Sequence, residues 1–194
     1  MASPIGASVQ TRGLRRVEYE RLVDLGMFSG ERLELLDGLL VVREPQGSSH
    51  AAIVSQIGRV LTDAFGSGWH VRLHSPLALD AESEPEPDVA VVAGTPRDYL
   101  EAHPAMAALV VEVADSSLRL DRHFKGGLYS RAGLPDYWIV NLVEAVVEVH
   151  RRPDSPAGAP HDSGYRSVEI LRPPAVVMPL AAPDRPIHVA DLLP

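Results

Sequence analysis

The sequence has no cysteine, and this absence removes three kinds of chemistry at once. A chain of 194 residues without cysteine forms no disulfide bond, thiolate nucleophile or cysteine-based zinc site. Any metal ion must then be held by Asp, Glu, His or backbone oxygen atoms. Lysine is nearly absent as well. Lys125 is the only lysine among the 18 basic residues, which makes it a candidate for a position where arginine does not serve.

Long hydrophobic runs are also missing. No segment approaches the ~20 apolar residues of a membrane-spanning helix. The first residues, MASPIGASVQTRGLRR, lack the apolar centre of a secretory signal. We therefore expect a cytoplasmic protein with no membrane association. The hydrophobic content of 45% and the charged content of 23% are those of an ordinary globular protein with a proper core.

Acidic residues outnumber basic ones and give the chain a net charge of −8. This charge argues against wholesale, non-specific attraction to nucleic acid. It leaves room for a local basic patch.

Helical and strand patterns are mixed along the chain without strict alternation. We predict a helix within residues 15–28, a hairpin within 32–45 that turns at Asp37-Gly38, helices capped by Ser48 or Ser49 and by Ser116 or Ser117, and strands within 69–80, 88–93, 108–114 and 136–152. This order favours an α/β (α+β) fold with a mixed central β-sheet flanked by helices.

A single domain accommodates all of these elements. We expect residues 1–14 to form a flexible N-terminal lead and residues 15–194 to form the domain. Its core would span residues 30–152, followed by C-terminal strands and a short helix within 163–194.

Two carboxylates stand in apolar segments, where a charge is costly unless something pairs with it. Asp88 follows Pro87 at the start of the run DVAVV, and Glu112 lies inside the run LVVEV. Both runs have the composition of central strands buried on both faces. A hard divalent ion with oxygen ligands, Mg²⁺ or Mn²⁺, would compensate the two charges. The alternatives are a turn residue for Asp88 and an arginine-paired or edge-facing residue for Glu112.

Lys125 lies in the predicted helix that follows Glu112. Asp121, Lys125 and Tyr129 are spaced four residues apart and share one helix face, so the lysine can point toward the sheet. An ammonium group there would orient a water molecule or stabilise developing negative charge. The apolar residues of this segment are expected to pack: Leu120, Phe124 and Leu128. The alternative for Lys125 is a surface ion pair with Asp121, worth ~0.3–0.5 kcal/mol.

These residues give the chain a family resemblance. An acid after proline at the start of a strand, with a second acid in a following strand, is similar to the PD-(D/E)XK nuclease superfamily. More closely, RLELLDGLLV, EPEPDVAVV, SSHAAIV and LVVEVADSSLRLDRHFKGGLYSRAGLPDYWIVN resemble the Uma-two family of restriction endonucleases, over roughly residues 15–150. One position departs from the superfamily pattern. Its lysine is expected two residues after the second acid, where this chain has Ala114, and the family resemblance moves that role to Lys125.

The resemblance implies a restriction-endonuclease-like core and metal-dependent hydrolysis of nucleic-acid phosphodiester bonds, with DNA expected as the substrate ahead of RNA. Asp88 and Glu112 would bind Mg²⁺ or Mn²⁺, and Lys125 would complete the catalytic set. A homodimer is a further expectation, because two sites related by a two-fold axis would cut both strands of a duplex.

Three more residues are secondary candidates for the site. Glu34, in the first strand of the predicted hairpin, matches an acid of the family pattern; its alternative is a solvent-facing strand residue. His50, in the first turn of its helix, either bonds substrate or water or is a plain surface residue. Asp121 either supports the metal ligands or only pairs with Lys125.

Two rival functions stay open at the level of sequence. The fold could be a non-catalytic module that binds nucleic acid or protein, which the net acidity supports. The joint presence of Asp88, Glu112 and Lys125 argues against that module. A metal-dependent hydrolase of a small phosphoester also fits the acidity. Divalent-ion binding would separate the module from both enzymes, and competition by DNA against a small phosphoester would separate the two enzymes.

Overall fold

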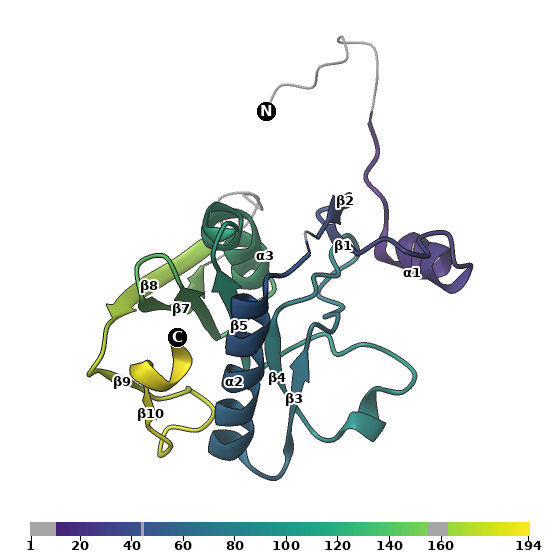
Figure 1. Ribbon diagram of the computed structural model, residues 1–194. Helices are drawn as coiled ribbons and strands as arrows, with labels where there is room; N and C mark the ends of the chain where they lie inside the picture. The colour runs from purple at the N-terminus through teal and green to yellow at the C-terminus, as the bar shows by residue number, and fades with distance from the viewer. Residues whose placement is uncertain (1–10, 44, 155–162) are drawn as a thin grey trace.

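The computed structural model describes residues 11–43, 45–154 and 163–194, and a six-stranded mixed sheet forms its centre (Figure 1). In spatial order its strands are β3 (Trp69–Leu73), β4 (Val89–Ala93), β5 (Leu109–Ala114), β6 (Asp136–Asn141), β7 (Val146–Asp154) and β8 (Gly164–Leu171). Strands β5 and β6 are parallel, and the other neighbouring pairs are antiparallel. The predicted mixed central sheet is therefore confirmed. Residues 1–10 of the predicted N-terminal lead lie outside the described residues.

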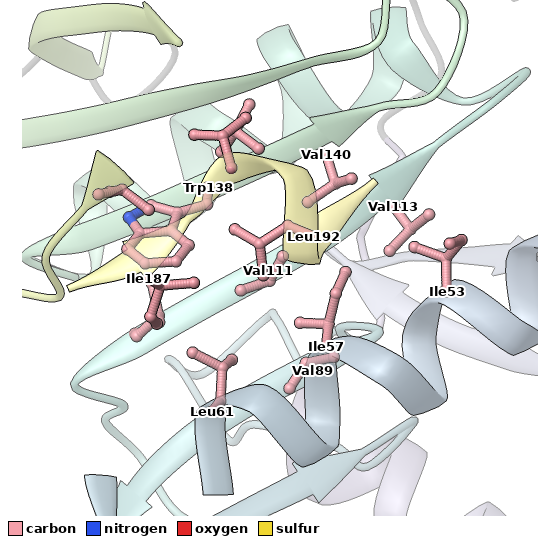
Figure 2. Packing of buried hydrophobic residues seen from close by; sticks show 14 of the residues in the cluster. Ile53, Ile57, Leu61, Val89, Val111, Val113, Trp138, Val140, Ile187 and Leu192 are labelled. Atoms are coloured by element: carbon pink, nitrogen blue, oxygen red, sulfur yellow. The ribbon is translucent and has the colours of Figure 1, made fainter. Parts of the chain in front are cut away.

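One face of the sheet is covered by helix α2 (Ser48–Phe65) and by the C-terminal segment. Ile57 and Leu61 of α2, Val111 of β5, Trp138 of β6 and Leu192 belong to one apolar cluster on this face (Figure 2). The C-terminal segment consists of the short strands β9 (Val176–Val177) and β10 (Ile187–His188) and the 3₁₀ turn η4 (Val189–Leu192). Burial of these apolar side chains provides the main stabilisation of this face.

The opposite face is covered by a second helix. It contains a π-helical segment, η2 (Leu120–Lys125), that continues into α3 (Gly126–Arg131). Val110 and Ala114 of β5 belong to the apolar cluster on this face. Because side chains alternate along a strand, Glu112 points to the same face, toward η2 and α3.

Helix α1 (Arg16–Asp24) and a hairpin, β1 (Leu33–Leu36) and β2 (Leu39–Val42), project from the sheet (Figure 1). The predicted turn is confirmed, because Asp37 and Gly38 have φ values of 48° and 74°, as a two-residue hairpin turn of type I′ requires. An isolated bridge between Leu35 and Glu84 joins the hairpin to the loop before β4. A further 3₁₀ turn, η1 (Pro96–Tyr99), follows β4.

Three local predictions are wrong. Helix α2 is capped by the backbone of Gly47 and not by Ser48 or Ser49, and no side chain caps it. Leu120 is 36% exposed and lines a cavity instead of packing in the core. Strand β7 continues to Asp154, beyond the predicted strand end at residue 152. Among the described residues, no helix is long and apolar enough to cross a membrane.

Candidate functional site

A cavity of about 500 Å³ opens between the end of the hairpin, the start of α2 and the π-helical segment. It is lined by all six residues that the sequence analysis selected: Glu34, His50, Asp88, Glu112, Asp121 and Lys125. These residues come from five separate parts of the chain, so the fold brings together groups that are distant in sequence. Five of them are buried; His50 is partly exposed.

Asp88 and Glu112 lie side by side because of the register of β4 and β5. Val89 pairs with Val111 in this antiparallel ladder, so Asp88, one residue earlier, lies next to Glu112. The Asp88 N–H donates to Glu112 Oε2 at 3.3 Å, and the Val113 N–H donates to Asp88 Oδ2 at 2.9 Å. Like charges on neighbouring strands repel, so this pair requires compensation from surrounding groups.

Asp88 receives that compensation from several donors. Its Oδ1 atom lies 3.2 Å from Gln46 Nε2 and 3.4 Å from His74 Nδ1, and its Oδ2 lies 3.3 Å from His50 Nε2. Burial alone would raise the pKa of Asp88, but hydrogen bonds from His50, His74 and the Val113 N–H outweigh burial and hold it well below its usual range. Asp88 is therefore ionised throughout the neutral pH range.

Glu112 is held by Lys125 and Tyr129. Its Oε1 atom accepts hydrogen bonds from Lys125 Nζ at 3.1 Å and from the Tyr129 hydroxyl at 2.8 Å. Burial raises the pKa of Glu112 to about 8, and the charge of Lys125 opposes this rise. The arginine-paired alternative for Glu112 therefore does not hold, since its cationic hydrogen-bond donor is the single lysine of the chain.

Lys125 links Glu112 to the hairpin. Its Nζ atom lies 3.3 Å from Glu34 Oε1, and both side chains are at most 5% exposed. Burial works to lower the pKa of Lys125, but the charges of Glu112, Glu34 and Asp121 outweigh it and raise the pKa, so the amine stays protonated. The alternatives of a surface Lys125 and a solvent-facing Glu34 are both excluded by this burial.

Asp121 enters the cavity from the π-helical segment. The Ser117 hydroxyl donates to its carboxylate, and the Gly126 N–H donates to its carbonyl oxygen across the wider turn. Burial raises the pKa of Asp121 to about 6, while the charge of Lys125 opposes the rise. Asp121 and Lys125 thus face the same cavity, although they form no direct ion pair.

His50 is fixed in one tautomer by its neighbours. Its Nε2 atom lies 2.9 Å from the Val113 carbonyl oxygen and 3.3 Å from Asp88 Oδ2. Both neighbours are acceptors, so Nε2 carries the hydrogen. Hydrogen bonding to Asp88 is the largest influence and raises the pKa of His50. His50 is consequently a support for Asp88 and not a plain surface residue.

Sequence reasoning missed Arg43, Gln46 and His74 as members of the site. All three contact the carboxylate of Asp88. Arg43 follows the hairpin sequence LLVV, where a lone arginine resembles an ordinary solvent-facing residue at a strand end. Tyr129 had one signal, its spacing of four residues from Lys125.

The donor chemistry of the cavity fits a divalent cation. Carboxylate oxygens are the ligands that hard cations prefer. Four buried carboxylates line the cavity, whereas Arg43 and Lys125 are its only Arg or Lys side chains among the described residues. Within that same part of the chain, no three His, Asp or Glu side chains are already arranged as a metal-binding group. The negative charge and the oxygen atoms of these carboxylates fit a divalent cation. In this structure the carboxylates of Asp88 and Glu112 accept hydrogen bonds from protein groups.

Comparison with known proteins establishes the fold and the family of the chain. One solved structure with the same fold is the crystal structure of "a putative nuclease belonging to DUF820" from Anabaena variabilis. It is 18% identical, with a TM-score of 0.64 over 84% of this chain and 90% of that chain. The similarity confirms the predicted fold class. No curated protein matches the sequence.

The sequence itself matches a family model over residues 16–190. The model is that of Uma2, described as "Putative restriction endonuclease", and it spans nearly the whole chain and every residue that lines the cavity. The predicted family is thus confirmed, and the chain belongs to the Uma2 family.

Proposed function

We propose that the protein is a metal-dependent endonuclease that hydrolyses phosphodiester bonds in nucleic acid, with DNA as the preferred substrate. Asp88 and Glu112 are the proposed ligands for Mg²⁺ or Mn²⁺. Lys125 is the proposed third catalytic group, while Glu34, His50 and Asp121 support these three residues. Two copies acting as a homodimer would cut both strands of a duplex.

The observation that carries the proposal is the placement of the one lysine. Lys125 is 4% exposed, protonated and within 3.3 Å of carboxylates from two other elements, in a cavity open to solvent. Burying an ammonium group is costly, and an ordinary surface ion pair would not require it. A catalytic role accounts for both the burial and the access to the cavity.

Each residue has a distinct task in this mechanism. A bound divalent ion would activate water and offset charge on a phosphoryl oxygen. Asp88 and Glu112 would hold it from adjacent strands, which keeps their separation fixed. The Lys125 ammonium group would orient the attacking water or stabilise the negative charge that develops on the phosphate. Tyr129 and His50 would keep the two carboxylates in place through their hydrogen bonds.

Metal titration and DNA cleavage test the proposal together. We expect Mg²⁺ and Mn²⁺ to bind the wild type in calorimetric titrations and Glu112→Gln to lose this binding. In the same buffers, we expect the wild type to cut plasmid DNA and Lys125→Met to lose at least ~10²-fold in rate. Glu169→Gln, which alters an exposed strand carboxylate, is the control and should behave as the wild type.

A second candidate, a non-catalytic binding module, is favoured by one observation. The carboxylates of Asp88 and Glu112 are already engaged by protein donors. If the wild type bound neither ion, the nuclease proposal would fail and this module would take its place. Binding of metal with hydrolysis of a small phosphoester, unaffected by competing DNA, would instead indicate a small-molecule phosphoesterase.

A further inference from the structure

Arg43 supplies a cation to two carboxylates that Lys125 does not contact, Glu86 and Asp88. Its Nη1 atom lies 3.0 Å from Glu86 Oε2, and its Nη2 atom lies 3.2 Å from Asp88 Oδ1. The side chain is only 10% exposed. The cavity therefore has two ion-paired groups, Lys125 with Glu34 and Glu112, and Arg43 with Asp88; Arg43 also pairs with Glu86, which does not line the cavity.

Both oxygen atoms of the Asp88 carboxylate already face protein donors. An ionised carboxylate offers about four lone-pair sites. Three hydrogen bonds reach Asp88: Arg43 and Gln46 donate to Oδ1, and the Val113 N–H donates to Oδ2. In addition, His74 Nδ1 lies 3.4 Å from Oδ1 and His50 Nε2 lies 3.3 Å from Oδ2. A metal ion that binds Oδ1 must therefore compete with Arg43 and Gln46.

Arg43 is the donor that an incoming cation would repel most. The Val113 N–H belongs to a central strand and cannot move away without breaking the sheet. Gln46 is neutral and carries no charge to repel the ion. Arg43 is permanently charged and reaches Asp88 through a long, rotatable side chain. It is also the only Arg or Lys side chain within ion-pair distance of Asp88 in the part of the chain that the structure describes.

We propose that Arg43 is a built-in counter-ion of Asp88 that a divalent cation must displace, so that Arg43 sets the metal affinity of the cavity. The inference rests on the proposed function, because it assumes that Asp88 is a metal ligand. The carboxylates of the cavity are suited to a cation, yet in this structure they bond to protein donors. A displaceable Arg43 accounts for both observations. Arg43 is a positioning residue in this scheme, because it acts through Asp88.

Calorimetric titration of Mg²⁺ into the wild type, Arg43→Met and Arg131→Met tests this role. Arg131 is the matched control. It pairs with two carboxylates, Asp37 and Asp80, and contacts the same hairpin, but it does not line the cavity. We expect Arg43→Met to bind Mg²⁺ about tenfold more tightly than the wild type, equivalent to ~1.4 kcal/mol. Arg131→Met should retain the wild-type affinity, although it removes the same charge from the protein.

Thermal unfolding supplies a readout that does not depend on activity. Without metal, we expect Arg43→Met to melt at a lower temperature than the wild type, because Asp88 and Glu86 lose their counter-ion. Saturating Mg²⁺ should raise the melting temperature of Arg43→Met by more than that of the wild type. Arg43→Lys keeps the positive charge and serves as a second variant if Arg43→Met does not fold. Its Mg²⁺ affinity should stay within about threefold of that of the wild type.

The outcomes separate this inference from the proposed function. Equal or weaker Mg²⁺ binding by Arg43→Met, with binding by the wild type intact, would overturn the inference alone and make Arg43 a residue that holds Asp88 in place for the metal. Binding by Arg43→Met about tenfold tighter than by the wild type would support it. If no variant bound Mg²⁺ or Mn²⁺, the inference and the proposed function would both fail.

Discussion

Glu84 is the residue that gives the clearest pH dependence of stability outside the cavity. Burial first, and then the adjoining Glu20, raise the pKa of Glu84 from 4.5 to about 7. In that pH interval the folded protein holds a proton that the unfolded chain has released. The free energy of unfolding therefore falls as the pH rises from 4.5 to about 7.

Glu84→Gln should remove this fall. Relative to the wild type, we expect the variant to gain ~1–3 kcal/mol in free energy of unfolding between about pH 4 and about pH 8. Urea denaturation at both pH values measures the change. Glu82→Gln, in an exposed position of the same loop, should follow the wild type. Parallel curves for Glu84→Gln and the wild type would refute the assignment.

For single residues, the sequence could identify the acids and the lysine of the site but not the residues that contact them. Asp88 and Glu112 stand out because a charge next to a strongly apolar strand needs a reason. Arg43 lacks such a signal, because its partner Asp88 is 45 residues away and the contact depends on how the hairpin docks. An arginine at the end of a strand gives no indication of a partner that is distant in the sequence.

Among the elements, the hairpin β1–β2 depends on a close backbone approach at its turn. A Cβ atom at Gly38 would lie 2.8 Å from Gly13 Cα, and the φ of Gly38 is 74°. We expect Gly38→Ala to lower the free energy of unfolding by ~2–3 kcal/mol in urea denaturation, since both strain and a backbone clash oppose alanine.

Gly133→Ala is the matched control for this prediction. Its φ of 75° is nearly the same, but nothing lies within 4 Å of the added Cβ. The expected loss is ~1–2 kcal/mol from the backbone conformation alone. Equal losses at the two positions would show that the approach to Gly13 is unimportant for docking the hairpin, which carries Glu34 and leads to Arg43.

The same elements mark the limit of prediction from local patterns. The turn at Asp37-Gly38 was predictable because a two-residue type I′ turn selects these residue types. The π-helical segment was not, because its spacing is compatible with an ordinary α-helix. Its wider turn is accompanied by a long-range contact, in which the Tyr137 hydroxyl donates to the Asp121 carbonyl oxygen. Such a contact has no signature within a window of a few residues.

For the molecule as a whole, the acidic charge predicts weak salt dependence of DNA binding. Arg43 and Lys125 are the only Arg or Lys side chains that line the cavity within the described residues, and both are paired with carboxylates. At about −0.9 per phosphate contact, we expect the slope of log K against log salt concentration to be about −2 or shallower.

Fluorescence anisotropy with Glu112→Gln and labelled duplex DNA, at constant Mg²⁺, measures this slope. The non-cleaving variant keeps the DNA intact during the titration. A slope steeper than about −4 would mean that a basic surface outside the cavity carries the binding, and the cavity would then be a minor part of the interface.

The burial of Lys125 also has a practical consequence. Because it is the only lysine, it carries the only side-chain amine in the protein, and it is 4% exposed. Its low exposure and its ion pairs with Glu34 and Glu112 slow acylation by amine-reactive reagents, so its labelling rate measures how often these contacts open. The protein therefore carries, at the centre of its candidate active site, a single natural chemical probe of its own fluctuations.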